Sequence, residues 1–248
     1  MQRRSFDDRL RILYIPFIIK FMKPICIIPA RKGSKRIKNK NIKLFAGKPL
    51  ISYVIKTAKK SKLFSRIIVS TDSKKIANIA KNNGAEVPFL RNKKLSDDYT
   101  GTAEVMVDSV KKINSSNIKY HFCIYPTASL INSRDLIKAF KIIKKKKLDH
   151  LVAMSNYNVP PFDACKKTKN DIIKFYWPKL AAQGSQNLPK LIHDTGTFYI
   201  YKTKALLMAK KKIIKKTTCY LLHKLKSVDI NTKEDFEFAE FLYKFNNK

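Results

Sequence analysis

The stretch from residue 24 to residue 50 reads PICIIPARKGSKRIKNKNIKLFAGKPL, and it sets the fold class of the chain. Its first six residues, PICIIP, are apolar and rich in isoleucine, which is typical of a buried strand in a parallel sheet. A glycine- and lysine-rich loop follows over residues 31–48. An apolar set then recurs at helical spacing: Leu50, Ile51, Val54, Ile55 and Ala58. The stretch therefore predicts a strand, a loop and a helix.

Segments of the same two kinds alternate along most of the chain. Strands are predicted over residues 24–29, 66–70, 86–90, 120–125, 150–155, 196–201 and 226–230. Helices are predicted between them, with Ser73, Thr102 and Ser133 as N-caps and with Thr232 and Asp235 as a capping box. Strands that alternate with helices indicate right-handed crossovers. We therefore predict an α/β fold with a mostly parallel sheet.

Two segments do not follow this alternation. Residues 156–190 contain four prolines and two short β-like pieces, so we predict a hairpin-like insertion in one domain over residues 22–248. Residues 1–21 contain an apolar run broken by Pro16 and lack the small-residue cleavage site of a signal peptide. We expect residues 1–21 to be an extension outside the fold. A short membrane-surface anchor is the alternative.

The composition narrows the class of partner. The chain has 248 residues, with 53 Lys and Arg against 18 Asp and Glu and a formal net charge of +35. Only nine of these cations are arginine, whereas a protein that reads nucleic acid more often favours arginine. We therefore expect no nucleic-acid partner, and a basic nucleic-acid-binding protein is the alternative from another class. No apolar run is long enough to span a membrane, so no membrane partner is expected.

The four cysteines are scattered and form no C-x-x-C pair. Cys26 and Cys123 lie inside predicted strands, so no disulfide framework or zinc site is predicted. Buried, reduced thiols indicate a cytoplasmic protein.

The loop after the first strand is the best candidate for a binding site. Ligands of parallel α/β sheets bind outside the carboxyl ends of the strands. Gly33 and Ser34 let backbone N–H groups approach phosphates, and Arg31, Lys35 and Lys40 can neutralise a triphosphate. The loop matches neither the P-loop nor the dinucleotide-binding pattern, so those enzyme classes are disfavoured. The alternative interpretation is a basic surface loop.

Several motifs occur in the order found in one family. They are IPARKGSK (28–35), KNKN (38–41), AGKPLI (46–51), IIVSTD (67–72), GAEVPFLR (84–91), LSDDYTGT (95–102), SQNLP (185–189), HDTGTFY (193–199) and VDINTKEDF (228–236). By these motifs the chain resembles the CMP-sugar synthetases, the cytidylyltransferases of sialic-acid-like sugars, from about residue 23 to its end.

This resemblance implies a Rossmann-like nucleotidyltransferase fold and an activity. The implied reaction transfers CMP from CTP to the anomeric hydroxyl of an acidic nine-carbon sugar and releases pyrophosphate. The forms EVPFLR and HDTG are most similar to those of the pseudaminic acid cytidylyltransferases, which implies CMP-pseudaminate as the product. N-acetylneuraminate enzymes more typically show Arg-Pro-Asn-Gly where this chain has His193-Asp194-Thr195-Gly196. Synthetases for N-acetylneuraminate, legionaminate or Kdo are the alternatives within the class.

The resemblance also implies roles for individual residues. Catalytic roles fall on Arg31, Lys40 and Asp229. Nucleotide binding falls on Ala30, Arg31, Gly33, Ser34, Lys40, Asn41, Arg91 and Thr102. Sugar binding falls on Tyr125, Thr127, Gln186, His193 and Asp194. Asp229 and Asn231 would hold Mg²⁺, the implied cofactor. CTP and the acidic sugar would be the ligands, and the product would serve flagellin or another surface glycan. The insertion would contribute to a homodimer interface, and a local core formed by its aromatic residues is the alternative.

Two departures from the family pattern bear on activity. Asn231 stands where the family has a second aspartate, so it can donate a carbonyl oxygen but no negative charge. Gly184 stands where relatives often have arginine, and Lys190 is a nearby replacement. These departures also leave a degenerate relative without catalysis as an alternative.

Several of these residues have a second interpretation. Asp235 is read as a helix cap rather than a ligand, and Asp229 could be an ordinary carboxylate at the end of a strand. Asp72 either faces the site or only precedes a helix cap. His193 is either a sugar contact or a buried structural imidazole.

Overall fold

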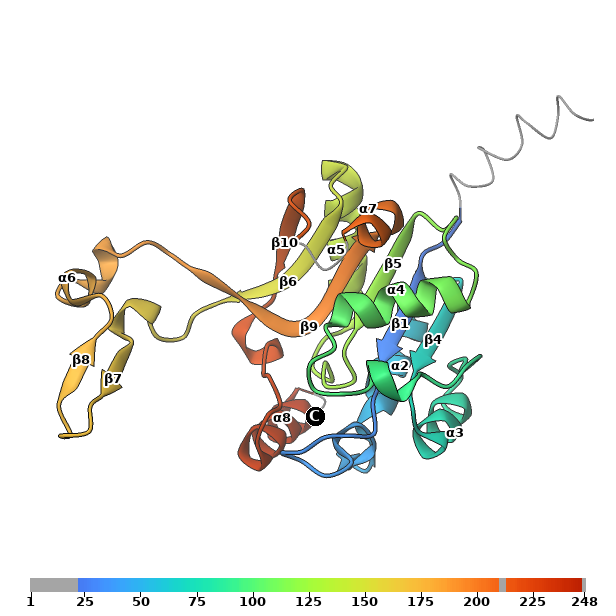
Figure 1. Ribbon diagram of the computed structural model, residues 1–248, viewed down its shortest axis with the longest axis horizontal. Helices are drawn as coiled ribbons and strands as arrows, with labels where there is room; N and C mark the ends of the chain where they lie inside the picture. The colour runs from blue at the N-terminus through green and yellow to red at the C-terminus, as the bar shows by residue number, and fades with distance from the viewer. Residues whose placement is uncertain (1–21, 210–212, 247–248) are drawn as a thin grey trace, which may run out of the picture.

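The computed structural model describes residues 22–209 and 213–246, so the predicted extension over residues 1–21 lies outside the described residues. A six-stranded sheet forms its centre, in the order β10-β6-β9-β5-β1-β4 (Figure 1). The strands are β1 (Ile25–Pro29), β4 (Arg66–Ser70), β5 (Tyr120–Ile124), β6 (His150–Asn156), β9 (Ile192–Lys202) and β10 (Thr217–Leu221). Only β9 runs against its neighbours, β5 and β6. The predicted α/β fold with a mostly parallel sheet is therefore confirmed.

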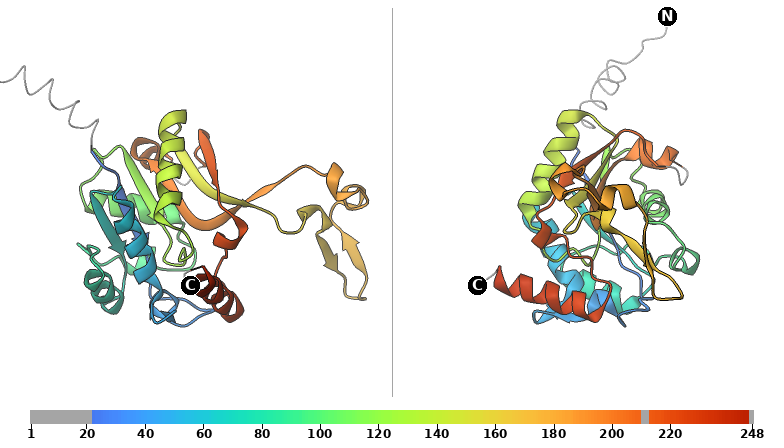
Figure 2. Two further views of the ribbon diagram at one scale, coloured as in Figure 1. Left: turned by 180° about the vertical axis from the view of Figure 1, so that it is seen from behind. Right: turned by 90° about the vertical axis from the view of Figure 1, so that its left-hand side faces the viewer.

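Helices cover both faces of the sheet (Figure 2). They are α2 (Leu50–Ser61), α3 (Lys74–Asn82), α4 (Thr102–Lys112), α5 (Ser133–Lys146) and α7 (Thr203–Met208), whereas α8 (Lys233–Phe245) packs against the loop after β1. The alternation of side chains along β1 explains the two layers. Cys26 and Ile28 pack in one buried cluster with residues of α2 and α5, whereas Ile25 and Ile27 pack in another with residues of α4 and α7. No helix within residues 22–209 and 213–246 is long and apolar enough to cross a membrane.

A third apolar cluster joins the loop after β1 to the last helix. The loop contains the short helix η1 (Lys40–Ile42) and a two-stranded ribbon, β2 (Leu44–Phe45) and β3 (Lys48–Pro49). The ring of Phe45 lies 5.5 Å from that of Phe236 on α8 and 5.3 Å from that of Tyr53 on α2, measured between centroids. Edge-to-face aromatic pairs of this kind fix the approach of their elements. The cluster therefore brings the segment before α8 to the loop.

Residues 156–192 form an arm that projects from the end of the sheet (Figures 1 and 2). The arm contains η3 (Pro161–Asp163), β7 (Cys165–Lys167), β8 (Ile173–Phe175), α6 (Pro178–Ala181) and η4 (Ser185–Asn187). Strands β7 and β8 pair as an antiparallel hairpin, as the sequence predicts. None of residues 156–192 is buried. The arm therefore has no core of its own.

Two predicted strands are wrong. Residues 86–90 form only two isolated bridges, from Ile68 to Glu86 and from Thr71 to Leu90. Residues 226–230 do not join the sheet, because Ile230 packs against α8 in the third cluster and the short helix η5 (Lys224–Lys226) precedes it. The sixth strand is instead β10, which the sequence analysis missed.

Two of the predicted N-caps are also wrong. Gly101 caps α4 and Asn132 caps α5, each one residue before the predicted cap. The caps predicted at Ser73 and Thr232 are confirmed, and Thr232 and Asp235 form the predicted capping box.

Candidate active site

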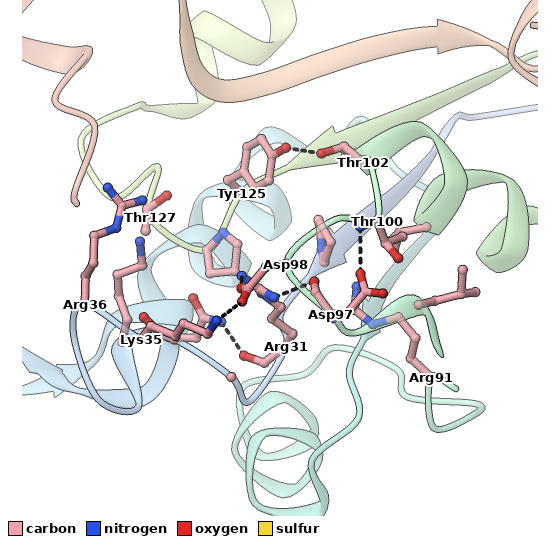
Figure 3. A pocket seen from close by; sticks show the side chains of 18 residues that line it. Arg31, Lys35, Arg36, Arg91, Asp97, Asp98, Thr100, Thr102, Tyr125 and Thr127 are labelled. Atoms are coloured by element: carbon pink, nitrogen blue, oxygen red, sulfur yellow. Dashed lines mark hydrogen bonds and ion pairs between the residues drawn. The ribbon is translucent and has the colours of Figure 1, made fainter. Parts of the chain in front are cut away.

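A cavity of about 410 Å³ opens at the carboxyl ends of β1 and β5 (Figure 3). We call it the strand-end cavity. Its walls come from the loop after β1, from the segment before α4 and from the end of β5. The residues that line it are Pro29, Arg31, Gly33, Ser34, Lys35, Arg36, Lys40, Asn41, Arg91, Leu95, Asp97, Asp98, Thr100, Thr102, Val105, Tyr125, Pro126 and Thr127. Seven of the predicted nucleotide-binding residues are among them, and the eighth is Ala30.

Side chains from neighbouring segments hold the loop after β1 in place. The backbone N–H of Lys32 donates to Asp72 Oδ1 at 2.7 Å. The side-chain amide of Asn41 donates to the carbonyl of Arg31 at 2.9 Å. Asp72 therefore supports the loop from the end of β4, while Ser73 beside it caps α3. Asp72 does not line the strand-end cavity, and its contact with the site is through the backbone of the loop.

Ala30 contributes no free backbone donor to the cavity. Its N–H donates to the carbonyl of Ser70 at 2.9 Å, and its side chain is buried under the sheet. The predicted nucleotide contact of Ala30 would have to use other atoms of this residue.

Two aspartates that the sequence analysis did not single out lie beside the cations of the loop. Asp98 accepts from Arg31 and from Lys35, each at 2.6 Å. The hydrogen bonds of Lys35 and Arg31 lower the pKa of Asp98. Asp97 accepts the N–H groups of Tyr99 and Thr100 and so shapes the turn that carries Asp98. Figure 3 shows the carboxylate of Asp98 pointing toward Arg31 and Lys35, whereas the carboxylate of Asp97 points toward Thr100.

Arg91 places unused donors in the wall of the cavity. Its residue surface is only 5% exposed, and its Nε and Nη2 atoms have no hydrogen-bond partner within the described residues. Burial lowers the pKa of Arg91. A buried guanidinium without an acceptor is costly, so its donors suit a ligand that carries acceptor oxygens or nitrogens.

Lys40 connects this cavity to the segment before α8. Its Nζ donates to the carbonyl of Ile230 at 2.6 Å. Burial lowers the pKa of Lys40, and the neighbouring Arg36 and Arg31 add to this, while the charge of Asp229 opposes it. Asp229 is exposed and therefore available to a ligand on the same side as the Lys40 ammonium.

Asp229 and Asn231 form an adjoining pair. Asn231 Nδ2 donates to Asp229 Oδ2 at 2.6 Å. The side-chain oxygen of Asn231 takes no part in this hydrogen bond. Gly196 has φ of 58°, and a Cβ built there would lie 4.0 Å from Asp229 Oδ1. Asp235 accepts the N–H groups of Asn231 and Thr232, so it acts as a cap, as the sequence predicts.

The donor set fits a magnesium ion that is held mainly by substrate. No cluster of three or more His, Cys, Asp or Glu in the described ranges could hold a metal by itself. Mg²⁺ commonly uses one or two carboxylates and completes its coordination with water and phosphate oxygens. Asp229 with the amide oxygen of Asn231 meets that need, whereas Asp97 and Asp98 are engaged by Arg31, Lys35 and the turn that follows them.

The predicted sugar-binding residues fall into two groups. Tyr125 and Thr127 line the strand-end cavity, and the hydroxyls of Tyr125 and Thr102 are hydrogen-bonded to each other. Burial raises the pKa of Tyr125. The ring of Tyr125 lies against that of Tyr199, whose hydroxyl donates to Asp194 Oδ2 at 2.8 Å. Asp194 is thus connected to the cavity through two tyrosines.

His193 and Gln186 lie farther out. The ring of His193 is half-buried, packs 4.9 Å from that of Tyr157 and shares a hydrogen bond with the carbonyl of Asp194. Gln186 is exposed on η4 of the arm, which extends away from the body (Figure 1). One chain therefore does not bring Gln186 to the strand-end cavity.

The comparisons with known proteins agree with this geometry. A model of the family described as cytidylyltransferase matches residues 25–247, which is nearly all of the described chain. The chain belongs to the cytidylyltransferase family.

Curated members of the cytidylyltransferase family resemble the chain over its whole fold. A pseudaminic acid cytidylyltransferase of Campylobacter jejuni is 37% identical over 92% of this chain and 99% of its own length. A CMP-N,N'-diacetyllegionaminic acid synthase of Legionella pneumophila is 30% identical, with the same two coverages.

Among solved structures, a CMP:2-keto-3-deoxy-manno-octonic acid synthetase complexed with CTP superposes with a TM-score of 0.68. It is 15% identical in sequence, and the match covers 90% of this chain and 99% of that one. At this identity the likeness shows the cytidylyltransferase fold alone.

Proposed function

We propose that this cytidylyltransferase transfers CMP from CTP to pseudaminic acid and so forms CMP-pseudaminate. The observation that carries the proposal is the 37% identity to a pseudaminic acid cytidylyltransferase over nearly the full length of both chains. The legionaminic acid enzyme matches the same length of chain at the lower identity of 30%. The substrate therefore follows the relative that shares more residues over the same fold.

The reaction forms one bond and breaks one bond at phosphorus. The anomeric hydroxyl oxygen of the sugar bonds to the α-phosphorus of CTP, the bond to the bridging oxygen breaks, and pyrophosphate leaves with the electron pair. The hydroxyl proton is released in the same step. Such a reaction needs alignment and charge neutralisation more than covalent participation by the protein.

The strand-end cavity contains groups suited to this work. Arg31, Lys35 and Lys40 would neutralise the phosphates, because all three face the cavity from the loop after β1. The unpaired donors of Arg91 would bind acceptor atoms of the nucleotide. Asp98 now occupies Arg31 and Lys35, so CTP would displace its carboxylate when the phosphates bind.

Asp229 and Asn231 would hold the magnesium ion that we propose as cofactor. When bound, the ion supplies positive charge to the phosphate oxygens as negative charge moves onto pyrophosphate. The adjoining side chains of Asp229 and Asn231 and the nearby ammonium of Lys40 support this assignment.

We also propose that two copies pair through the arm. Ile173, Phe175, Tyr176 and Trp177 are 60%, 49%, 60% and 47% exposed, although all are large and apolar. Phe162 and Trp177 touch with centroids 6.1 Å apart, but this contact leaves the other side chains open. Large apolar groups exposed together are typical of an interface. A second copy would cover them and could also bring Gln186 to a sugar.

The proposed reaction also leads to an expectation about where in the cell the enzyme acts. The reaction consumes CTP, so we expect the enzyme to act in the cytoplasm. A CMP-activated sugar is a glycosyl donor, and we expect its product to serve the glycosylation of flagellin or another surface glycan.

A substrate panel tests the proposal. The protein is incubated with CTP, Mg²⁺ and one of pseudaminate, N-acetylneuraminate, N,N'-diacetyllegionaminate or Kdo, and release of pyrophosphate is followed with the CMP-sugar. We expect the highest kcat/KM with pseudaminate. Turnover of another sugar in its place would contradict the substrate, and no pyrophosphate release with any sugar would contradict catalysis.

A further inference from the structure

A second cavity lies beside the first and is lined by a different set of residues. It has a volume of about 550 Å³ and is bounded by one face of α2, by residues 129–133, by residues 223–226 and by the end of α8. We call it the α2 cavity. It is larger than the strand-end cavity and within the size range of small-molecule sites. None of the residues assigned above to CTP, sugar or magnesium lines it.

Among the residues that the structure describes, the basic side chains of the α2 cavity have no acidic counterpart along its wall. Lys56, Lys60, Lys226 and His223 line it, and none of the described residues along its wall is acidic. Lys226 is paired with Asp135 at 2.8 Å, but Lys56 and Lys60 form no ion pair within the described part of the chain. Both lie on the same face of α2, four residues apart. Two unpaired ammonium groups therefore share one concave wall.

Lysines alone do not define a site in a chain with a net charge of +35. The second observation is Ser129, which lines the same cavity. It is only 4% exposed, and its hydroxyl has no hydrogen-bond partner within the described residues. Buried hydroxyls are normally paired, because an unpaired one costs free energy that water or a partner would supply. A ligand acceptor in the cavity would supply the partner.

We propose that the α2 cavity binds an organic phosphate. The ammonium groups of Lys56 and Lys60 and the hydroxyl of Ser129 can all donate, and phosphate oxygens only accept. The volume exceeds that of a single phosphate group, and Leu130 and Leu225 also line the cavity. The wall thus suits a phosphate that carries a compact, partly apolar group.

The location of the α2 cavity couples it to the strand-end cavity. Residues 125–133 run between the two: Tyr125, Pro126 and Thr127 line the first, and Ser129 with its successors lines the second. The N–H of Ala128 donates to the carbonyl of Tyr125 at 3.0 Å, and that of Ser129 to the carbonyl of Thr127 at 2.8 Å. A turn this short moves as a unit. A phosphate held at Ser129 therefore shifts the position of Tyr125 and Thr127 and changes the affinity for CTP.

Calorimetric titration of the full chain with CMP, pyrophosphate or inorganic phosphate tests the site. The three probes separate an organic phosphate from a free one. Arg31→Ala identifies binding in the strand-end cavity, because Arg31 lines only that cavity. We expect one binding event with CMP that is still observed in Arg31→Ala. The affinity of this event should fall at least tenfold in the double variant Lys56→Gln and Lys60→Gln. If inorganic phosphate or pyrophosphate binds at this site more tightly than CMP, the proposal that the ligand is an organic phosphate is wrong.

Two further variants keep the test decisive. The double variant Lys144→Gln and Lys145→Gln removes the same charge from exposed positions of α5 and is the matched control. Ser129→Ala removes the unpaired hydroxyl without a change of charge, so we expect weaker binding of CMP with an unchanged or raised Tm. The absence of any event in Arg31→Ala, equal loss in the two double variants, or unaltered binding in Ser129→Ala would each overturn the site.

Steady-state rates test the coupling. In the wild type, we expect part of the effect of CMP on the KM for CTP to arise from the α2 cavity. This part should be lost when Lys56 and Lys60 are replaced. Purely competitive behaviour in both proteins would overturn the coupling. Because the titrations need no acid sugar, they remain decisive even where the proposed sugar proves wrong.

Discussion

The two ends of the candidate active site are built in different ways. At the nucleotide end, Arg31 follows β1, Lys40 lies on η1, and Arg91 is joined to the end of β4 by its N–H, which donates to the carbonyl of Thr71. All three are held by contacts within one chain. At the sugar end, Gln186 lies on an arm in which no residue is buried, and His193 lies where that arm joins the sheet. The residues of the first end are brought together by one chain, whereas the second end includes residues of an exposed arm.

This difference predicts two kinds of functional defect in variants. A change at the nucleotide end should affect every reaction of CTP, whatever the sugar. A change in the arm should affect the sugar and the assembly but leave CTP binding intact. The predictions below test that separation, from the largest expected effect to the smallest.

Arg31→Ala should lower kcat/KM for CTP about 100-fold. A charge-assisted hydrogen bond contributes about 1.5–3 kcal/mol, and Arg31 has donors for more than one phosphate oxygen. Initial rates of pyrophosphate release measure the effect. Lys38→Ala is the matched control, since Lys38 is an exposed cation of the same loop that does not line the cavity. Equal activity of the two variants would contradict the role of Arg31.

Phe175→Asp and Trp177→Asp should convert a dimer into monomers and lower turnover of the sugar about tenfold. Each change places a charge in a surface whose burial would stabilise the pair. Light scattering measures the assembly, and calorimetry with CTP should show unchanged affinity. Lys174→Asp, on the same strand, adds the charge without removing an apolar group. If the wild-type protein is monomeric at assay concentration, the proposed pairing of two copies through the arm is wrong.

Asn231→Asp should tighten Mg²⁺ binding severalfold. The new carboxylate would lie beside Asp229, at the 2.6 Å contact that the amide of Asn231 makes now. Without metal the two charges repel, so the rise in Tm on adding Mg²⁺ should be larger than in the wild type. Asn231→Ala should have the opposite effect. If neither variant alters the Mg²⁺ dependence of the rate, this position is not a ligand.

The pH dependence of CTP binding should reflect Lys40. Burial lowers the pKa of Lys40, and only the protonated amine attracts phosphate. The KM for CTP should therefore begin to rise at a pH below that of an ordinary lysine, by a few-fold across the alkaline limb. Lys40→Arg should shift this limb upward, because arginine stays charged there. Identical alkaline limbs in the two proteins would show that another group titrates.

The sequence predicts the fully buried strands and misses one exposed strand at the edge of the sheet. Strands β1 and β5 are continuous apolar runs and were placed correctly. Strand β10 is an edge strand in which no residue is buried, so it has no hydrophobic pattern to recognise. Residues 226–230 have that pattern for a different reason, since Ile230 packs on α8.

The candidate site shows the same limit. The loop after β1 could be predicted because its cations and glycine are adjacent in the sequence. Asp98 could not, because its role depends on Arg31, which lies 67 residues earlier. The unpaired donors of Arg91 likewise become visible only when its surroundings are known.

The root of the arm has a consequence for substrate choice. Strands β6 and β9 pair there, with Ser155 opposite His193 and Asn156 opposite Ile192. A rotation of the arm therefore turns the peptide that carries His193 and Asp194, without any relay through the body. In the proposed dimer, selectivity among acid sugars would therefore depend on how the two copies meet, at positions that do not contact the sugar.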